Sequence, residues 1–100
     1  MKTFKEIQNG NSPYCGMKES TLQTINDYVE KGWEPGGFTT AVLANDLMMA
    51  FCRADEENRH SLFQICNYVY NEIPSSCHGS YEVVESWLNS FRSKVPNEMS

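Results

Sequence analysis

The sequence predicts an all-α domain, a compact bundle of about four helices that follows an irregular N-terminal arm. Apolar residues recur at helical spacing in several segments of the chain. Capping residues and glycine or proline stops separate these segments, and no convincing stretch alternates apolar and polar residues as a strand would. A chain of 100 residues is long enough for one domain with a modest core.

Residues 1–19 are predicted to form an irregular arm, because glycine or proline interrupts them at Gly10, Pro13 and Gly16. A first helix is expected from about 21 to 31. Ser20 and Gln23 have the spacing of a capping box before an apolar helical face. Gly32 can take the left-handed conformation that ends many helices, so the helix is expected to stop there.

A second helix is expected from about 40 to 54, with Thr39 as its N-cap. Its apolar residues cover most of the circumference and leave one narrow polar stripe, formed by Asn45, Asp46 and Arg53. A helix of this kind is expected at the centre of the bundle, covered by its neighbours and by another copy of the chain. The pattern therefore favours a homo-oligomer.

A third helix is expected up to residue 73, because Pro74 cannot continue it. Asp55 can cap its start, and the first turn carries Glu56 and Glu57 at the positive end of the helix dipole. The sequence leaves open whether this segment is a separate helix or a kinked continuation of the second one.

The last helix is expected to begin at Gly79-Ser80 and to end before Pro96. Its apolar residues form one stripe that can close the bundle. No linker or repeat divides the chain, so the helical domain is predicted to span residues 20–95, and residues 96–100 are predicted to be a flexible tail.

Polar residues gather near the junction of the second and third helices, where the helical pattern would place more core. One interpretation is structural: Arg53 or Arg59 pairs with an aspartate, and Asn58 caps a helix end. The other is that these groups line a polar hollow for a small molecule, because ligand pockets combine apolar walls with a few convergent polar groups.

A glycine-rich turn, Gly36-Gly37, precedes Thr39 and Thr40 and opens the second helix, where free backbone N–H groups favour anions. Such a turn is also ordinary helix initiation. The candidate ligand-binding residues predicted from both features are Thr39, Thr40, Asn45, Asp46, Arg53, Asp55, Asn58 and Arg59.

The sequence gives little support for catalysis, for a metal site or for a cofactor. Neither His60 nor His78 has a recognisable nucleophile or orienting carboxylate, and no known catalytic motif occurs. The cysteines, Cys15, Cys52, Cys66 and Cys77, form no C-x-x-C pair. Cys52 and Cys66 are expected to act as small hydrophobic residues in helices. We therefore expect a protein that is not an enzyme.

The formal charge of −5, with only 8 scattered Lys and Arg residues, argues against broad binding of nucleic acid. No apolar run is long enough to span a membrane, and the start of the chain has no apolar segment typical of a secretory signal. The expected location is therefore the cytoplasm.

The stretch from about residue 28 to 88 resembles a group of small, mostly uncharacterised proteins of tailed bacteriophages and prophages. The shared pattern is a glycine-rich start, then Ala-Val-Leu, Asn-Asp-Leu, Arg-Ala-Asp, Tyr-Asn-Glu and Gly-Ser. The matching residues are Gly37, Phe38, Ala41, Val42, Leu43, Asn45, Asp46, Leu47, Arg53, Ala54, Asp55, Asn58, Tyr70, Asn71, Glu72, Pro74, Gly79, Ser80 and Trp87. The resemblance implies a protein made in an infected bacterium, in the host cytoplasm, but it assigns no biochemical role.

Two functions are consistent with this resemblance. The first is an anti-defence protein that sequesters a nucleotide-like immune signal of the host in the polar hollow. The second is an inhibitor that binds a basic host protein through an acidic surface, expected to comprise Asp27, Glu30, Glu34, Glu82 and Glu85. A structural or morphogenesis role is a third hypothesis.

Overall fold

A computed structural model describes residues 1–92, and these residues form helices joined by short connections, with no strand among them. The all-α prediction is therefore confirmed, but the helices are more numerous and shorter than predicted. In chain order the elements are α1 (Phe4–Ile7), α2 (Glu19–Lys31), α3 (Gly37–Leu43), α4 (Leu47–Arg53), α5 (Glu56–His60), α6 (Leu62–Glu72), the 3-10 turn η1 (Ser75–Cys77) and α7 (Tyr81–Arg92).

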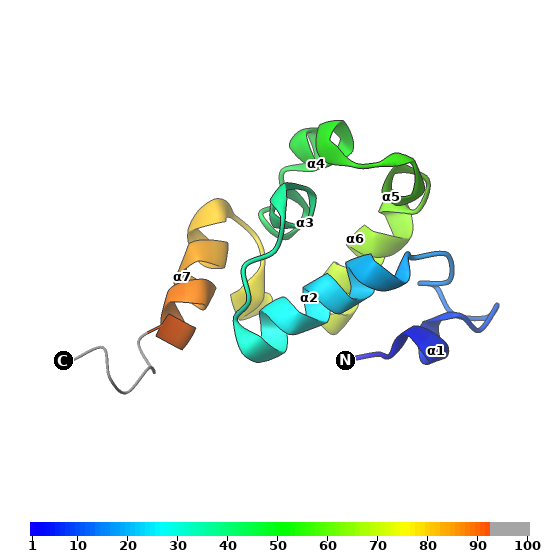
Figure 1. The fold of residues 1–100 in the computed structure, drawn as a ribbon, viewed down its shortest axis with the longest axis horizontal. Helices are drawn as coiled ribbons and strands as arrows, with labels where there is room; N and C mark the ends of the chain where they lie inside the picture. Colours follow the sequence, from blue (N-terminus) through cyan, green and yellow to red (C-terminus); the bar gives the residue numbers. More distant parts are fainter. Residues whose placement is uncertain (93–100) are drawn as a thin grey trace.

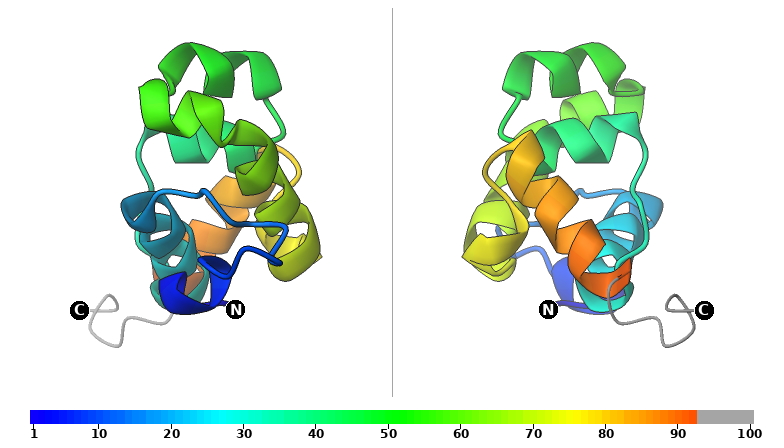
Figure 2. Two further views of the ribbon diagram at one scale, coloured as in Figure 1. Left: turned by 90° about the vertical axis from the view of Figure 1, so that its right-hand side faces the viewer. Right: turned by 90° about the vertical axis from the view of Figure 1, so that its left-hand side faces the viewer.

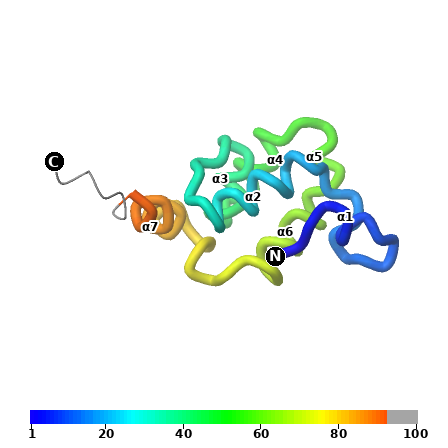
Figure 3. The backbone as a smooth tube through the Cα atoms, turned by 60° about the horizontal axis from the view of Figure 1, so that its bottom comes forward, coloured from blue at the N-terminus to red at the C-terminus, as the bar shows by residue number. Residues whose placement is uncertain are grey.

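The helices are arranged along one long axis (Figure 1). The α7 helix lies at one end, and α1 with the loop that follows it lies at the other. Figure 3 shows the same order from another direction, with α7 set apart from the N-terminal segment. Fully buried side chains from α2, α3 and α6 form the core between these ends, among them Ile25, Tyr28, Leu43, Ile65 and Tyr68.

The helix predicted from 21 to 31 is present as α2, and its predicted stop is confirmed. Gly32 has φ 69°, and its N–H is donated to the carbonyls of Asp27 and Tyr28. The prediction of a Ser20 capping box was wrong, because the N-cap is Lys18 and no side chain caps this end.

The prediction of one helix from 40 to 54 was wrong, because the chain breaks between α3 and α4. Asn45 has φ 63°, a conformation that asparagine tolerates better than most residues. Asp46 then caps α4 by accepting a hydrogen bond from the backbone N–H of Met49. The start also differs, since α3 begins at Gly37 and Thr39 is buried inside the helix rather than serving as N-cap.

The third predicted helix also divides, here into α5 and α6 at Ser61. The Ser61 hydroxyl donates to the carbonyl of Glu57 at 3.0 Å, and its backbone has φ −106° and ψ 16°. Such a local bond offers the backbone an alternative to a straight helix. Asp55 caps α5 as predicted, because its carboxylate accepts from the N–H of Asn58 at 2.8 Å.

The first 19 residues are more ordered than an irregular arm. Thr3 and Glu6 form a capping box that starts α1. Ile7, Tyr14 and Met17 are buried in the same core as the later helices. The last predicted helix is present as α7 to Arg92, while its expected extension to residue 95 and the expected tail lie outside the described residues.

Candidate functional site

The predicted polar residues do not meet in one hollow, because each engages a different neighbour. Asn58 is buried and accepts a hydrogen bond from the Thr21 hydroxyl of α2 at 2.6 Å. Asp55 pairs with Lys18, and this contact together with the Asn58 N–H lowers the pKa of the Asp55 carboxyl. These contacts are structural, but the predicted partners were wrong: within residues 1–92 neither arginine forms an ion pair with an aspartate, and the Asn58 side chain bonds to Thr21 instead of capping a helix.

The two predicted arginines also lie apart from any shared recess. Arg59 is exposed, donates to the carbonyl of Ala54 at 3.3 Å and lies 5.1 Å from the centre of the Phe51 ring. Arg53 is exposed and lies against Gly37, where a Cβ atom would come within 2.6 Å of its Nη1. The prediction that the polar residues converge into a single pocket is therefore not what the structure shows.

Asp46 connects the α3–α4 junction to α7. One of its carboxylate oxygens accepts from Met49 N–H, and the other accepts from the Tyr81 hydroxyl at 2.7 Å. The hydrogen bond from Tyr81 to this carboxylate raises the pKa of the tyrosine. Because Tyr81 is the first residue of α7, this contact ties α7 to the cap of α4.

A groove of about 300 Å³ lies between α7, the start of α3 and the connection that precedes α3. The residues that line it, here named the acidic groove, are Glu34, Thr40, Tyr81, Glu82, Val84, Glu85, Leu88 and Arg92. Val84 and Leu88 are buried, and the three glutamates are exposed. The groove thus combines an apolar floor with an acidic rim.

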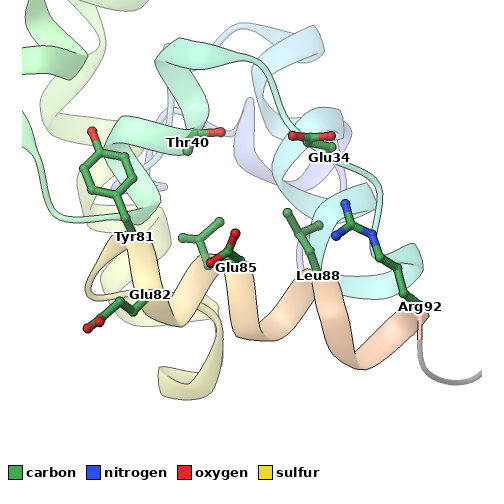
Figure 4. Close-up of a pocket in the computed structure, with 8 residues that line it drawn as sticks. Glu34, Thr40, Tyr81, Glu82, Glu85, Leu88 and Arg92 are labelled. Carbon is green, nitrogen blue, oxygen red and sulfur yellow. The ribbon is translucent and has the colours of Figure 1, made fainter.

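Figure 4 shows how α7 forms one wall of the acidic groove. Tyr81, Glu85, Leu88 and Arg92 point from α7 toward Thr40 and Glu34, whereas Glu82 points away from them. Their spacing of four, three and four residues places them on one face of a helix. Glu34 lies opposite, on the connection that follows α2.

Three contacts fix the walls of the groove. The indole N–H of Trp87 donates to the Tyr28 carbonyl at 3.0 Å and holds α7 on α2. The N–H of Gly79 donates to the Leu43 carbonyl at 2.7 Å and holds the segment before α7 on α3. The Ser80 hydroxyl accepts from Val83 N–H, which satisfies a donor at the start of α7. The groove is therefore preformed by the fold.

The electrostatic character of the groove follows from its unpaired carboxylates. No ion pair within residues 1–92 involves Glu34, Glu82 or Glu85. Among the described residues, Arg92 is the one cationic side chain that lines the groove, and its guanidinium donates to the side chain of Asn89 at 2.8 Å. Such a surface attracts positive charge, and the apolar floor can cover the aliphatic part of a lysine or arginine.

The sequence identified part of this surface. Glu34, Glu82 and Glu85 were expected to share an acidic face with Asp27 and Glu30, but the last two lie elsewhere. Asp27 pairs with Lys31 at 3.5 Å and also accepts from Gln23, while Glu30 lines a separate hollow beside the N-terminus. The groove residues Tyr81, Leu88 and Arg92 were missed, although their spacing with Glu85 could have indicated a shared face.

A second cavity, of about 320 Å³, lies between α3 and α6. Its lining is mostly apolar and includes one predicted ligand residue, Asn45, together with Tyr70 and His78. Cys66 also lines it and is half-buried, and burial raises the pKa of its thiol. Cys52, expected to lie among apolar neighbours, is instead exposed on α4.

Neither cavity is lined by Arg53, Asp55, Asn58 or Arg59. Within the part of the chain that the structure describes, no group of three or more His, Cys, Asp or Glu side chains is placed to hold a metal ion. None of the helices in that part is both long and apolar enough to cross a membrane. The four cysteines are all free thiols.

Comparison of the chain with protein families, characterised proteins and solved structures gave no match. The resemblance to small proteins of tailed phages and prophages therefore stays a prediction from the sequence. Function is therefore inferred from the acidic groove and from the cavity between α3 and α6.

Proposed function

We propose that this chain is a non-enzymatic binding protein of the phage type, which engages a basic segment of a host protein through the acidic groove. The observation that carries the proposal is the combination of unpaired carboxylates and a buried apolar floor in one preformed groove. The phage origin rests on the sequence resemblance. The expected setting is the cytoplasm of the infected host.

The chemistry of recognition follows from the two parts of the groove. Carboxylates attract a cationic partner over distance and increase its rate of association. Val84 and Leu88 offer apolar contact to the methylene groups of a lysine or arginine once it arrives. Because Glu34 and Glu85 lie on opposite walls, a partner with at least two separated positive charges fits better than one with a single charge.

A defined probe tests this proposal. A fluorescent peptide that alternates lysine and leucine should bind the native chain, and its affinity should fall as salt is raised from about 50 to 300 mM, because exposed charges are screened. The variant Glu34→Gln/Glu85→Gln should weaken binding about tenfold or more. Anisotropy titration measures both effects.

The matched control is Glu19→Gln/Glu30→Gln, which removes the same charge from exposed positions on α2. It should leave the affinity for the peptide within about twofold of the native value. Equal losses in the two double variants would show that net charge, not the groove, attracts the peptide. The proposed site would then be wrong.

A second candidate function is sequestration of a nucleotide-like immune signal, as the sequence first indicated. The observation that favours it is the second cavity, where an exposed aromatic ring, Tyr70, lies near Asn45 and His78. Aromatic rings stack on nucleobases, and amides read their edges. Cyclic dinucleotides, cyclic trinucleotides and cyclic ADP-ribose variants should then raise the melting temperature, and Tyr70→Ala should remove the shift. A flat response at millimolar ligand would reject this candidate.

A further inference from the structure

The α4 helix exposes its large apolar side chains and buries only Ala50. Leu47, Met48 and Phe51 are 55%, 74% and 46% exposed, whereas Ala50 is fully buried. The sequence pattern had placed this segment at the centre of the bundle. The structure places α4 at the outer edge of the molecule, as both views of Figure 2 show.

The exposed residues of α4 share one face. Leu47, Met48, Phe51 and Cys52 follow the spacing i, i+1, i+4 and i+5, which places neighbouring side chains on the same side of a helix. We name this surface the α4 face. Packing α4 on α3 through alanine leaves these larger side chains between 46% and 74% exposed within residues 1–92.

The rim of the α4 face carries charges of both signs. Glu56 and Arg59 lie three residues apart on α5, the helix that follows α4, and so share one side of it. Within residues 1–92 neither of these two residues forms an ion pair. Arg59 also lies over the Phe51 ring, so positive charge borders the apolar surface directly.

We propose that the α4 face binds a second copy of this chain in a two-fold dimer. A two-fold interface pairs a surface with itself, so its rim must hold charges that can complement one another. The α4 rim meets this condition with Arg59 and Glu56. The acidic groove does not meet this condition, because its carboxylates would repel the same carboxylates of a second copy. The dimer therefore leaves the groove free and is independent of its proposed function.

The available area sets the strength of this dimer. If a fully exposed side chain of this size presents about 200 Å², the exposed parts of Leu47, Met48 and Phe51 together offer roughly 350 Å² per copy. A weak dimer buries up to about 600 Å² per partner, and a standard one about 800 Å². The α4 face and its charged rim together can bury an area in the range of the weak dimer. We therefore expect a weak, concentration-dependent dimer rather than a permanent one.

Sedimentation of the full chain between about 10 µM and 1 mM tests the assignment. The native chain should shift from monomer toward dimer as its concentration rises. Met48→Asp should keep the chain monomeric throughout, because an aspartate at the centre of the interface would be desolvated. The matched control is Trp33→Asp, which changes another exposed apolar side chain, 58% accessible, on the connection after α2. This control should dimerise as the native chain does.

Cysteine alkylation provides a second measurement that needs no variant. Cys52 lies on the α4 face and is exposed, so its reaction with iodoacetamide should slow as dimer forms. A native chain that stays monomeric up to 1 mM would overturn the proposal, and would point to a different protein as the partner of α4. Dimerisation that survives Met48→Asp, or that Trp33→Asp abolishes equally, would also overturn it.

Discussion

The hydrogen bond between Thr21 and Asn58 shows what a buried polar residue does in this chain. Both side chains are buried, and the Thr21 hydroxyl donates to the Asn58 side-chain oxygen at 2.6 Å. Asn58 also donates its backbone N–H to Asp55, so it links α2 to the cap of α5. Its role is to join two helices in the interior.

Removing either side chain of this pair should destabilise the fold. Asn58→Ala leaves the Thr21 hydroxyl without its acceptor, and Thr21→Val leaves the Asn58 oxygen without its donor. We expect each change to lower the free energy of unfolding by about 1–3 kcal/mol. The double variant should lose less free energy of unfolding than the two single losses added together, by about 1 kcal/mol. The reason is that both single variants remove the same hydrogen bond, which the double variant loses only once.

Urea unfolding of the four proteins measures this coupling, and Thr21→Ser, which keeps the hydroxyl, serves as the control. Additive losses would indicate that the two residues do not depend on each other. The sequence placed Asn58 among polar groups near a helix junction, and that much was right. It could not reveal Thr21 as the partner, because 37 residues separate the two and only the packing of α2 brings them together.

Helix boundaries were predictable where a single residue decides them. Gly32 ends α2 and Asp55 caps α5 through local backbone geometry, and both were identified from the sequence. The break between α3 and α4 was missed, because its apolar pattern continues across the junction. There a left-handed Asn45 and the Asp46 cap override the continuous helical pattern.

Substitution of Asn45 tests how firmly the α3–α4 break is fixed. A left-handed conformation costs a residue with a Cβ about 1–2 kcal/mol, and glycine avoids this cost. Asn45→Ala should therefore lower the free energy of unfolding by about 1 kcal/mol. Asn45→Gly should lie within about 0.5 kcal/mol of the native chain.

Chemical unfolding compares the stabilities, and circular dichroism reports helix content. If Asn45→Ala instead raised both stability and helix content, the junction would have straightened into the single helix that the sequence pattern indicates. The break would then depend on this one side chain. Our expectation is the opposite, because Asp46 also bonds to Tyr81 and holds the junction from outside the helix.

At the scale of the whole molecule, the N-terminal segment is joined to the core by polar contacts. Lys2 N–H donates to the Tyr68 hydroxyl, which in turn donates to the Asn26 side chain at 2.7 Å. The Tyr14 hydroxyl donates to Glu72 at 2.7 Å across 58 residues of sequence. The sequence did not predict that the N-terminal segment is ordered, because its structure arises from packing against α6 and not from local helix signals.

The same packing explains which surfaces remain for binding. The polar residues predicted as a site are mostly used in joining helices, whereas the acidic groove and the α4 face are left open. All three glutamates that line the groove were recognised from the sequence as acidic surface. The apolar floor beneath them was not, because Val84 and Leu88 belong to the stripe that also packs α7 on the core.

Tyr14 should make stability depend on pH in the alkaline range. Burial, and then the hydrogen bond to Glu72, raise the pKa of Tyr14 to about 12. An unfolded tyrosine titrates near 10, so between about pH 10 and 12 the unfolded chain releases a proton that the native chain keeps. The unfolded state then binds fewer protons, and the free energy of unfolding falls as pH rises. The contribution of Tyr14 is fully present below about pH 10.

Urea unfolding at several pH values from 8 to 11.5 measures this fall. Tyr14→Phe should be less stable than the native chain at pH 8, because Glu72 loses a donor, yet its stability should decline less steeply above pH 10. Burial also raises the pKa of Tyr68 and of Tyr28, so some decline should persist in the variant. Tyr70→Phe removes a hydroxyl from a ring that is 80% exposed and should keep the native slope. If Tyr14→Phe also kept that slope, the N-terminal segment would not hold Tyr14 in the core as the structure indicates.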